Sequence, residues 1–330
     1  MAVTANTNET YDVSTIREDL SEAMASLSPT ETVFMSAIGT RNVDNTYFEW
    51  SEVDLAATGA NRQIEGDVGL SNTAPTNAVR KGGYTQISAK VVEVSSTNQA
   101  VNGVANAQTV AKQVAYKLSE LKRDMEAMLL SNVAAAVGSS GTARQTAGLP
   151  AYLTSNVSRG SGGANGTTSG TGESGSVNAA ATDGTLRPIT ETLLKSVIAD
   201  CWSSGATPTI VMCGSAQKQK ISTFTGNATR FKEAEDSKLN AAIDVYISDF
   251  GELQIVPNRH MRVRTVSSVD YTPDVFVLDP NYAEVAYLQT AKQEPLAKTG
   301  LSERRLISCE YGLQVTSQKA HGVVADINAS

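Results

Sequence analysis

The chain has 330 residues, of which 41% are hydrophobic, 18% charged and 5% aromatic, and its formal net charge is −7. This length and apolar content can supply a buried core, while the acidic balance argues against a dedicated nucleic-acid reader, which needs a basic surface to neutralise phosphates. We find no signal peptide and no apolar run long enough to span a bilayer, so the sequence predicts a chain with no membrane contact.

The start of the chain, residues 1–43, is interpreted as an N-terminal arm. A first short helix is predicted from four apolar residues spaced three or four apart: Ile16, Leu20, Met24 and Leu27. Pro29 ends that pattern, and a second short helix is predicted over residues 30–35, with Gly39 beyond its end. We expect this second helix to dock on the body of the protein.

Residues 44–96 predict a long two-stranded excursion. Two strands, 46–55 and 84–94, are separated by a stretch that contains six glycines and prolines. An isolated hairpin buries too little apolar area to offset its loss of backbone entropy, so something else must cover it. A neighbouring copy is the favoured cover, with Trp50 and Tyr84 as anchors and with Arg80 and Lys81 as a charged contact; packing on its own domain is the alternative.

A long helix is predicted from residue 105 to residue 137. Its apolar residues recur at helical spacing along one stripe, including Val110, Val114, Leu118, Leu121 and Met125. At about 1.5 Å rise per residue, this helix is about 50 Å long. We interpret it as a spine.

Residues 138–185 are rich in Gly and Ser and predict a surface insertion or mobile loop. Residues 170–175 match the pattern G-x-G-x-x-G, but no strand is predicted before them and no helix after them. Nucleotide binding requires that strand and that helix, so it is disfavoured here.

The second half of the chain predicts mixed structure. Helices are expected at 188–202 and 215–224, and strands at 209–213, 243–247, 252–256, 262–266, 275–278, 284–288, 304–316 and 321–327. The order lacks the regular alternation of a doubly wound sheet and is typical of an α+β fold.

Residues that usually carry catalysis are sparse. Cys201, Cys213 and Cys309 are widely spaced and predict buried thiols, and the two histidines, His260 and His321, have no neighbouring ligand pattern and predict surface or strand positions. No Walker loop, metalloprotease motif or nucleophile elbow is present. We therefore expect no cofactor and no metal.

One basic cluster stands out in residues 259–264. If these residues form a strand, Arg262 and Arg264 share one face. Pairing with acidic residues, such as those of 232–236, within or between subunits is favoured, and contact with packaged nucleic acid is the alternative.

Together with the order of these elements, four strings identify a family likeness: LSELKRDME (118–126), YISDFG (246–251), VPNR (256–259) and PLAKTG (295–300). The chain resembles the major capsid (major head) proteins of tailed bacteriophages, which have the Hong Kong 97-type fold. The likeness runs from about Tyr11 to Ile327. It implies six segments: the arm (1–43), an extended loop (44–96), a spine helix of the peripheral domain (97–137), a Gly/Ser-rich insertion (138–185), an axial domain (186–255) and peripheral-domain strands with the C-terminus (256–330).

The resemblance also implies a function. The chain would assemble as pentamers and hexamers into an icosahedral head around double-stranded DNA, with a separate scaffolding protein, a portal and possibly a decoration protein as partners. It would act in the virion after assembly in the host cytoplasm, without enzymatic activity. We select six candidate assembly contacts: Trp50, Arg80, Lys81, Tyr84, Arg262 and Arg264.

Three other readings stay open at this stage. A bacterial encapsulin-type nanocompartment would share the fold. An enzyme that uses acidic residues is a second, although no pair of carboxylates is selected by the sequence. An extracellular fibre or adhesin is disfavoured, because a long helix followed by α+β structure does not suit a fibre.

Overall fold

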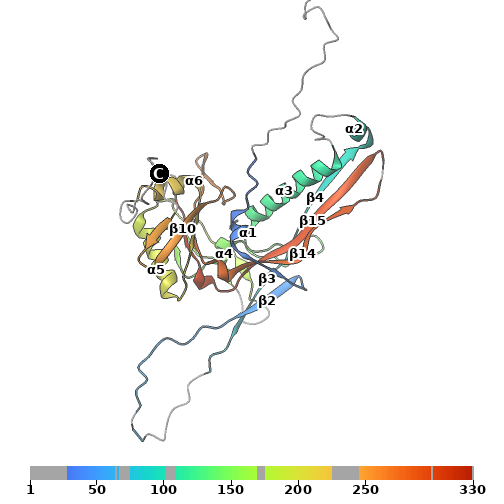
Figure 1. Cartoon of the computed structure of the whole chain (residues 1–330). Helices are drawn as coiled ribbons and strands as arrows, with labels where there is room; N and C mark the ends of the chain where they lie inside the picture. The colour runs from blue at the N-terminus through green and yellow to red at the C-terminus, as the bar shows by residue number, and fades with distance from the viewer. Residues whose placement is uncertain are drawn as a thin grey trace, which may run out of the picture.

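The computed structural model describes residues 28–63, 65–66, 75–101, 109–168, 175–224, 245–298 and 300–328. Two sheets, each with its own helices, meet near the short helix α1 (Val33–Ala37) (Figure 1). Three sequence predictions lie outside the described residues: the first arm helix, the acidic residues 232–236 and most of the G-x-G-x-x-G match.

A four-stranded sheet forms the long side of the molecule, which we call the peripheral sheet. Its strand order is β1 (Gly39–Asn42), β14 (Ala283–Pro295), β15 (Ser302–Val315) and β4 (Gln86–Ser95). The register of β14 against β15 runs from Ala283↔Val315 to Pro295↔Arg305, so these two strands form a long antiparallel ribbon. The short helix α2 (Ser96–Ala100) follows β4 directly.

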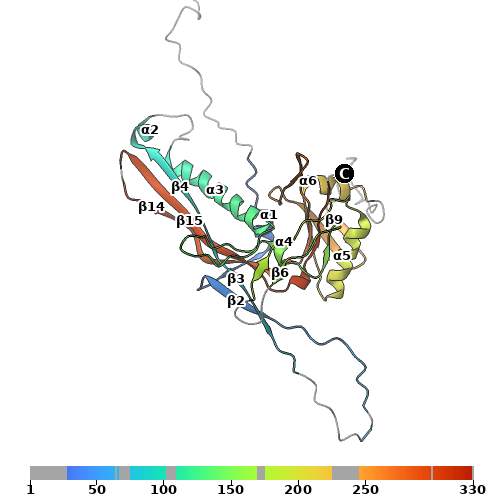
Figure 2. The ribbon, with the colours of Figure 1, turned by 180° about the vertical axis from the view of Figure 1, so that it is seen from behind.

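The helix α3 (Val110–Leu129) lies along the peripheral sheet and covers one of its faces (Figures 1 and 2). Its apolar stripe is buried at Leu121, Met125 and Leu129, as the 3.6-residue spacing predicts. With 20 residues it is about 30 Å long.

The predicted end of this helix, at residue 137, is wrong. The Asn132 side chain donates to the Ala181 carbonyl at 2.6 Å and accepts the Ala181 N–H at 3.0 Å, and the Ala135 N–H donates to the Val177 carbonyl at 2.9 Å. The chain beyond Leu130 therefore bonds to a distant segment in place of its own preceding turn. This competition cannot be read from helical spacing alone.

A six-stranded sheet forms the other side, which we call the axial sheet. Its order is β5 (Val157–Ser158), β16 (Gly322–Val324), β13 (Val275–Leu278), β8 (Ile210–Cys213), β10 (Gly251–Pro257) and β9 (Val245–Ser248). The helices α5 (Glu191–Ser203) and α6 (Ser215–Ile221) lie beside it in Figure 2, and the buried apolar residues of α5 and α6 share one core cluster with this sheet.

Strands of the axial sheet come from several parts of the chain. Three of its strands, β5, β13 and β16, come from outside residues 186–255, because β13 pairs with β8 and β16 pairs with both β13 and β5. The segment 256–330 consequently supplies strands to both sheets.

The Gly/Ser-rich segment is also more structured than predicted. It contains the helix α4 (Leu149–Tyr152), in which Leu149 and Ala151 are buried in the main core, and the short pair β6 (Thr167–Thr168) and β7 (Val177–Ala179). The apolar run at 147–153 is short and is flanked by glycine and polar residues, so the overall composition of the segment does not reveal it. The prediction of a surface insertion is wrong for this part.

The predicted hairpin exists with a different second strand. The strand β2 (Tyr47–Glu52) pairs with β3 (Val79–Tyr84), whereas the predicted partner, 84–94, is mostly β4 of the peripheral sheet. The remaining described elements are the small hairpin of β11 (Arg264–Val266) and β12 (Val269–Tyr271), and the 3-10 turns η3 (Pro280–Tyr282) and η4 (Gln318–Ala320).

All three cysteines are buried and unpaired, as predicted. Of the two predicted positions, surface or strand, His321 takes a buried one directly before β16, whereas His260 is partly exposed. In the parts of the chain that the structure describes, no helix combines the length and apolar content needed to cross a bilayer.

Candidate assembly surfaces

The root of the excursion is the β2–β3 hairpin, whose two faces have different roles. Alternation places Phe48 and Trp50 on the face toward the body, and both are buried. On the other face, the rings of Tyr47 and Tyr84 are paired with centroids 4.8 Å apart. The hairpin is therefore fixed to its own subunit on one face and partly open on the other.

Two ion pairs cross this hairpin diagonally. Arg80 pairs with Glu49 on the open face, and Lys81 pairs with Glu52 on the face toward the body. Glu52 also accepts a hydrogen bond from the Ser317 hydroxyl at 2.6 Å, which ties the hairpin to the start of η4, just after β15. The sequence pointed to the two cations but to neither acid, because the acids that lie near Arg80 and Lys81 depend on the β2–β3 register.

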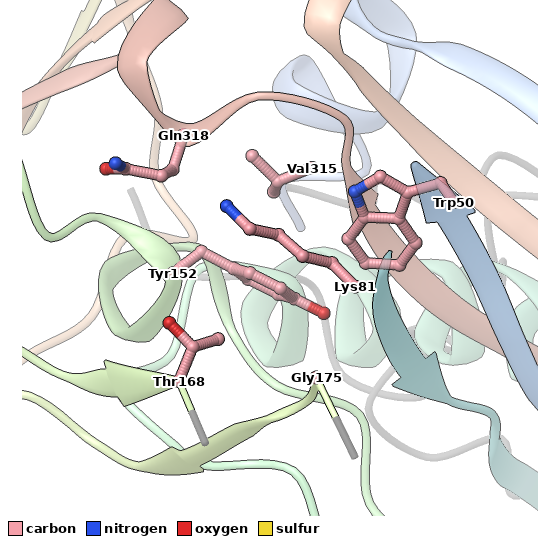
Figure 3. Close-up of a pocket in the computed structure, with 7 residues that line it drawn as sticks. All are labelled: Trp50, Lys81, Tyr152, Thr168, Gly175, Val315 and Gln318. Atoms are coloured by element: carbon pink, nitrogen blue, oxygen red, sulfur yellow. The ribbon is translucent and has the colours of Figure 1, made fainter. Parts of the chain in front are cut away.

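Trp50 lies in the core of its own subunit, and this revises its predicted position as an anchor on a neighbour. Its ring is stacked with Phe48 and tilted against Tyr152, with centroids 6.0 Å and 6.5 Å apart. Figure 3 shows the Lys81 side chain beside the rings of Trp50 and Tyr152. These three residues line a cavity of about 10 Å³. That volume is about the size of one water molecule, so it is too small for an organic ligand.

Tyr152 supports the hairpin by packing against Trp50. Its hydroxyl donates to the Leu313 carbonyl at 3.0 Å, and burial, together with the nearby Tyr47, raises the pKa of Tyr152 above its ordinary value. Tyr152 is thus a neutral hydrogen-bond donor that joins α4 to β15 beneath the hairpin.

Beyond the root, the chain leaves the body. Figure 1 shows the two described limbs of the excursion, 53–63 and 75–78, running away from the side of β2 and β3. Nearly all of these residues are exposed, and Leu55 has 85% of its surface exposed. An exposed ion pair from Lys319 to Asp54, at 2.6 Å, is the last described side-chain link to the body.

The peripheral sheet has one covered face and one open face. Val92 and Val94 of β4 face α3 and are buried, whereas the alternate residues Ile87 and Val91 are exposed, Ile87 by 61%. Val91 lies opposite Leu306 of β15 in the register. We call these residues, with the exposed Ala89 and the partly exposed Leu306, the outer stripe (Ile87, Ala89, Val91 and Leu306).

Glu126 joins the arm to the rest of the subunit. Its carboxylate, fully buried on α3, accepts the N–H groups of Phe34 at 2.6 Å and Met35 at 2.9 Å, in the first turn of α1. It also accepts from the Asn258 side-chain amide at 2.7 Å. A carboxylate at a helix N-terminus satisfies otherwise unpaired donors, so Glu126 caps α1 from a distant helix.

Arg262 and Arg264 pair with acidic residues inside the subunit, which is the kind of contact the sequence favoured. Arg262 bonds Asp183 at 2.8 Å and Asp274 at 2.9 Å, and Arg264 bonds Asp326 at 3.0 Å. Burial alone lowers the pKa of Arg262, but Asp274 and Asp183 outweigh burial and raise the pKa of the guanidinium. The three acids come from separated loops that no local pattern connects.

Of the six predicted contacts, the structure brings together Trp50, Arg80, Lys81 and Tyr84 at the hairpin, and Arg262 and Arg264 at a separate ionic cluster. Only Arg80 and Tyr84 lie on the open face of the hairpin. Within the described ranges, no group of three His, Cys, Asp or Glu side chains is arranged to hold a metal ion. The structural features that stand out are surfaces and an excursion.

Known phage capsid proteins resemble this chain in sequence. The family model described as SU10 major capsid protein matches residues 3–328. The major capsid protein of Escherichia phage Phieco32 is 31% identical over 125 residues, which cover 38% of this chain and 35% of that relative, so the match spans about a third of its length.

Solved structures extend the likeness over almost the whole chain. The capsid of the Cyanophage P-SCSP1u has a TM-score of 0.63 at 11% identity, covering 99% of this chain and 97% of that one. A Mycobacterium phage Bobi structure has a TM-score of 0.62 at 10% identity, covering 97% and 98%. The holo-SrpI encapsulin complex from Synechococcus elongatus has a TM-score of 0.57 at 10% identity, covering 96% and 94%. The predicted α+β fold of the Hong Kong 97 type is confirmed.

Proposed function

Because the chain belongs to the SU10 major capsid protein family, we propose that it is the subunit of an icosahedral phage head, assembled as pentamers and hexamers around double-stranded DNA. The excursion carries this proposal. Its described limbs are exposed and have few links to their own subunit beyond the root. Such a segment gains order only by packing on something else, and in a shell of identical copies that partner is a neighbour.

The outer stripe of the peripheral sheet is the surface that we assign to the neighbour's excursion. It offers Ile87 and Val91 to solvent, and the excursion offers Val53 and Leu55. When the two apolar sets cover each other, both leave contact with water. This burial stabilises the contact by about 25 cal/mol per Å² of apolar area. Each contact is modest, and the lattice repeats it by symmetry.

The axial sheet, with α5 and α6, is proposed to meet its copies at the five-fold and six-fold centres. Arg80 and Tyr84 are proposed contacts at the hairpin. Trp50, Lys81, Arg262 and Arg264 contribute by holding their own subunit in the shape that assembles, since their described partners lie within it.

Other partners follow from the same role. A scaffolding protein, a portal and possibly a decoration protein would act with this subunit during assembly in the host cytoplasm, and no catalytic step is needed. The net charge of −7 suits a container that holds DNA without binding it tightly, because strong phosphate binding would hinder packaging.

A second candidate is a nanocompartment shell, favoured by one observation, the fold likeness to the encapsulin complex. Its TM-score is lower than those of the two phage structures reported above. The contents of purified particles separate the two functions. Nuclease-protected DNA would support a phage head, and a stoichiometric protein cargo without DNA would support a nanocompartment.

Electron microscopy with sedimentation tests the proposal. The chain, expressed with its neighbouring genes, is expected to form closed shells. A variant in which residues 56–78 are replaced by a short Gly/Ser link is expected to give folded subunits that do not close into shells. Replacing the segment with a Gly/Ser linker of equal length controls for chain length. Shells of normal size from the shortened variant, or monomers alone from the unmodified chain, would contradict the proposal.

A further inference from the structure

A groove separates the short helix α1 from the axial sheet. It has a volume of about 510 Å³, and one wall belongs to α1 and the residues just before it, whereas the other belongs to β8 and β10. The first wall includes Val33 and Ser36, and the second includes Ile210, Gln254 and Val256. The described part of the arm therefore does not fill the space beside the axial sheet, which leaves α1 room to change its position.

The helix α1 has little stability of its own. It has five residues, which is too short for a helix that persists in water by itself, and among these five only Phe34 is buried. The Thr32 side chain, at the N-cap position, does not bond to the first turn. Contacts with other elements must therefore hold α1 in place.

Glu126 supplies polar contacts to both sides of the groove. On the side of α1, its fully buried carboxylate accepts the N–H groups of Phe34 at 2.6 Å and Met35 at 2.9 Å. On the side of the sheet, it accepts the Asn258 side-chain amide at 2.7 Å. Asn258 directly follows β10, and its own N–H donates to the Cys213 carbonyl at the end of β8, at 2.9 Å. One side chain thus links α1 to the strand ends of the axial sheet.

A carboxylate suits this position because its two oxygens only accept hydrogen bonds. All three partners of Glu126 are donors. If an NH₂ group replaced one oxygen, it would face a donor and leave that buried N–H without an acceptor, which is costly. A change of Glu126 to Gln is therefore expected to weaken the contact with α1 while keeping the size of the side chain.

The C-terminal end of α1 is fixed separately. The strand β1 begins two residues after α1 and pairs in parallel with β14, with Gly39 beside Glu284. Just beyond β1, the Val43 N–H donates to the Tyr287 carbonyl at 2.9 Å. The helix can therefore leave its place on the body by turning about the start of β1 while β1 stays in the peripheral sheet.

We infer that α1 has a docked and an undocked position, and that Glu126 is the positioning residue that holds it docked. The docked helix forms one wall of the groove. Undocking would open the groove above Ile210 and Val256 and change the direction of the arm relative to the body. The inference goes beyond the proposed function and concerns the single subunit, so unassembled chains can test it.

Distance measurements across the groove test the inference. Ser36→Cys and Gln254→Cys place spin labels at exposed positions of the two walls, and the three native thiols are buried. Glu126→Gln is expected to broaden the distribution of label distances at least about twofold, because undocked positions become populated. Leu121→Ala, the matched control on the same helix, is expected to lower stability without broadening it. An unchanged distribution in Glu126→Gln, or equal broadening in Leu121→Ala, would overturn the inference.

Hydrogen exchange gives a second measurement that needs no labels. The N–H groups of Phe34 and Met35 are bonded to Glu126, so their exchange reports docking directly. In Glu126→Gln they are expected to exchange at least about tenfold faster than in the unmodified chain, whereas the Val43 N–H keeps its rate. Unchanged exchange at Phe34 and Met35 would overturn the role of Glu126. Equal acceleration at Val43 would show that the arm detaches as a whole and would overturn the assignment of two positions to α1.

Asn258→Ala provides the same test if Glu126→Gln does not fold. This variant keeps the carboxylate and removes the donor that orients it from the side of the sheet. The N–H groups of Phe34 and Met35 are expected to exchange about threefold faster in Asn258→Ala than in the unmodified chain. The absence of any acceleration at these two groups would overturn the inference.

Discussion

The body of the subunit and its excursion use the same chain in opposite ways. In the body, α3 covers the peripheral sheet, α5 and α6 cover the axial sheet, and the large apolar side chains between them are almost fully buried. In the excursion, residues 53–63 and 75–78 are nearly all exposed, and the described side-chain link from this part to the body is an exposed ion pair. The buried side chains of the body therefore stabilise the folded subunit, while the excursion is available for contacts between copies.

The first prediction compares one leucine from each region. Leu121→Ala, on α3, removes a side chain with 1% of its surface exposed and is expected to lower the free energy of unfolding by about 2 to 5 kcal/mol. Leu55→Ala, in the excursion, is expected to change it by less than about 0.5 kcal/mol. Urea unfolding of unassembled subunits measures both. A similar loss in the free energy of unfolding in the two variants would contradict the distinction between the two regions.

The second prediction concerns pH and a buried residue of the body. Burial lowers the pKa of His321 from its ordinary value to about 4. Between pH 6.5 and pH 4 the unfolded chain binds a proton that the folded chain does not, so stability falls as the pH falls, by up to about 3 kcal/mol from this group.

Unfolding midpoints from pH 7 to pH 4 check this prediction. His321→Gln is expected to flatten the pH dependence relative to the unmodified chain, and His260→Gln, at a partly exposed position, serves as the matched control. An unchanged slope in His321→Gln would show that other groups carry the acid sensitivity.

The third prediction concerns the boundary between the two regions. A Cβ on Gly82 would lie 2.3 Å from the Tyr47 hydroxyl oxygen and 2.5 Å from its ring, so Gly82→Ala must displace the ring and is expected to cost about 1 to 2 kcal/mol. Gly59→Ala, in the excursion, meets nothing within 4 Å and is expected to be neutral. Thermal unfolding distinguishes them, and a neutral Gly82→Ala would mean that the hairpin root tolerates a shifted ring.

The smallest expected effect is at an exposed ion pair. Arg80→Ala removes the pair with Glu49 on the open face, where half of the Arg80 side chain is exposed, and is expected to change subunit stability by less than about 1 kcal/mol. Lys81→Ala, on the face toward the body, is expected to cost more, because it leaves the mostly buried Glu52 without its cation. A larger loss of stability in Arg80→Ala than in Lys81→Ala would show that the ion pair on the open face stabilises the hairpin more.

Much of the fold could be predicted because its signals are local. The spacing of Leu121, Met125 and Leu129 predicted α3, and short apolar runs predicted β8, β10 and β13 close to their observed bounds. What failed depended on distant partners. Asn132 ends the spine by bonding to Ala181, and the strand that begins at Gln86 pairs with β15. Spacing along the chain holds no information about either partner.

The candidate surfaces were predictable to a smaller degree. Arg80 and Lys81 were selected as charged contacts, but whether a charge is satisfied inside the subunit depends on which acids the fold brings near. Glu49 and Glu52 become partners only once the β2–β3 register is known, and Asp183, Asp274 and Asp326 meet the two arginines from three separate loops. Trp50 resembled an interface residue by type, and the ring of Tyr152 places it in the core.

The order of the strands in the axial sheet also affects how fast the subunit folds. Among the described strands, β5 pairs with β16 alone, about 165 positions later in the chain, and β16 joins the centre of the sheet through β13. Pairings between such distant segments form slowly, because the loop must close before the contact stabilises it. Newly made chains should therefore pass through a stage in which α3 and the β14–β15 ribbon are formed and the edge of β16 is still unpaired. During that stage the subunit is most exposed to aggregation.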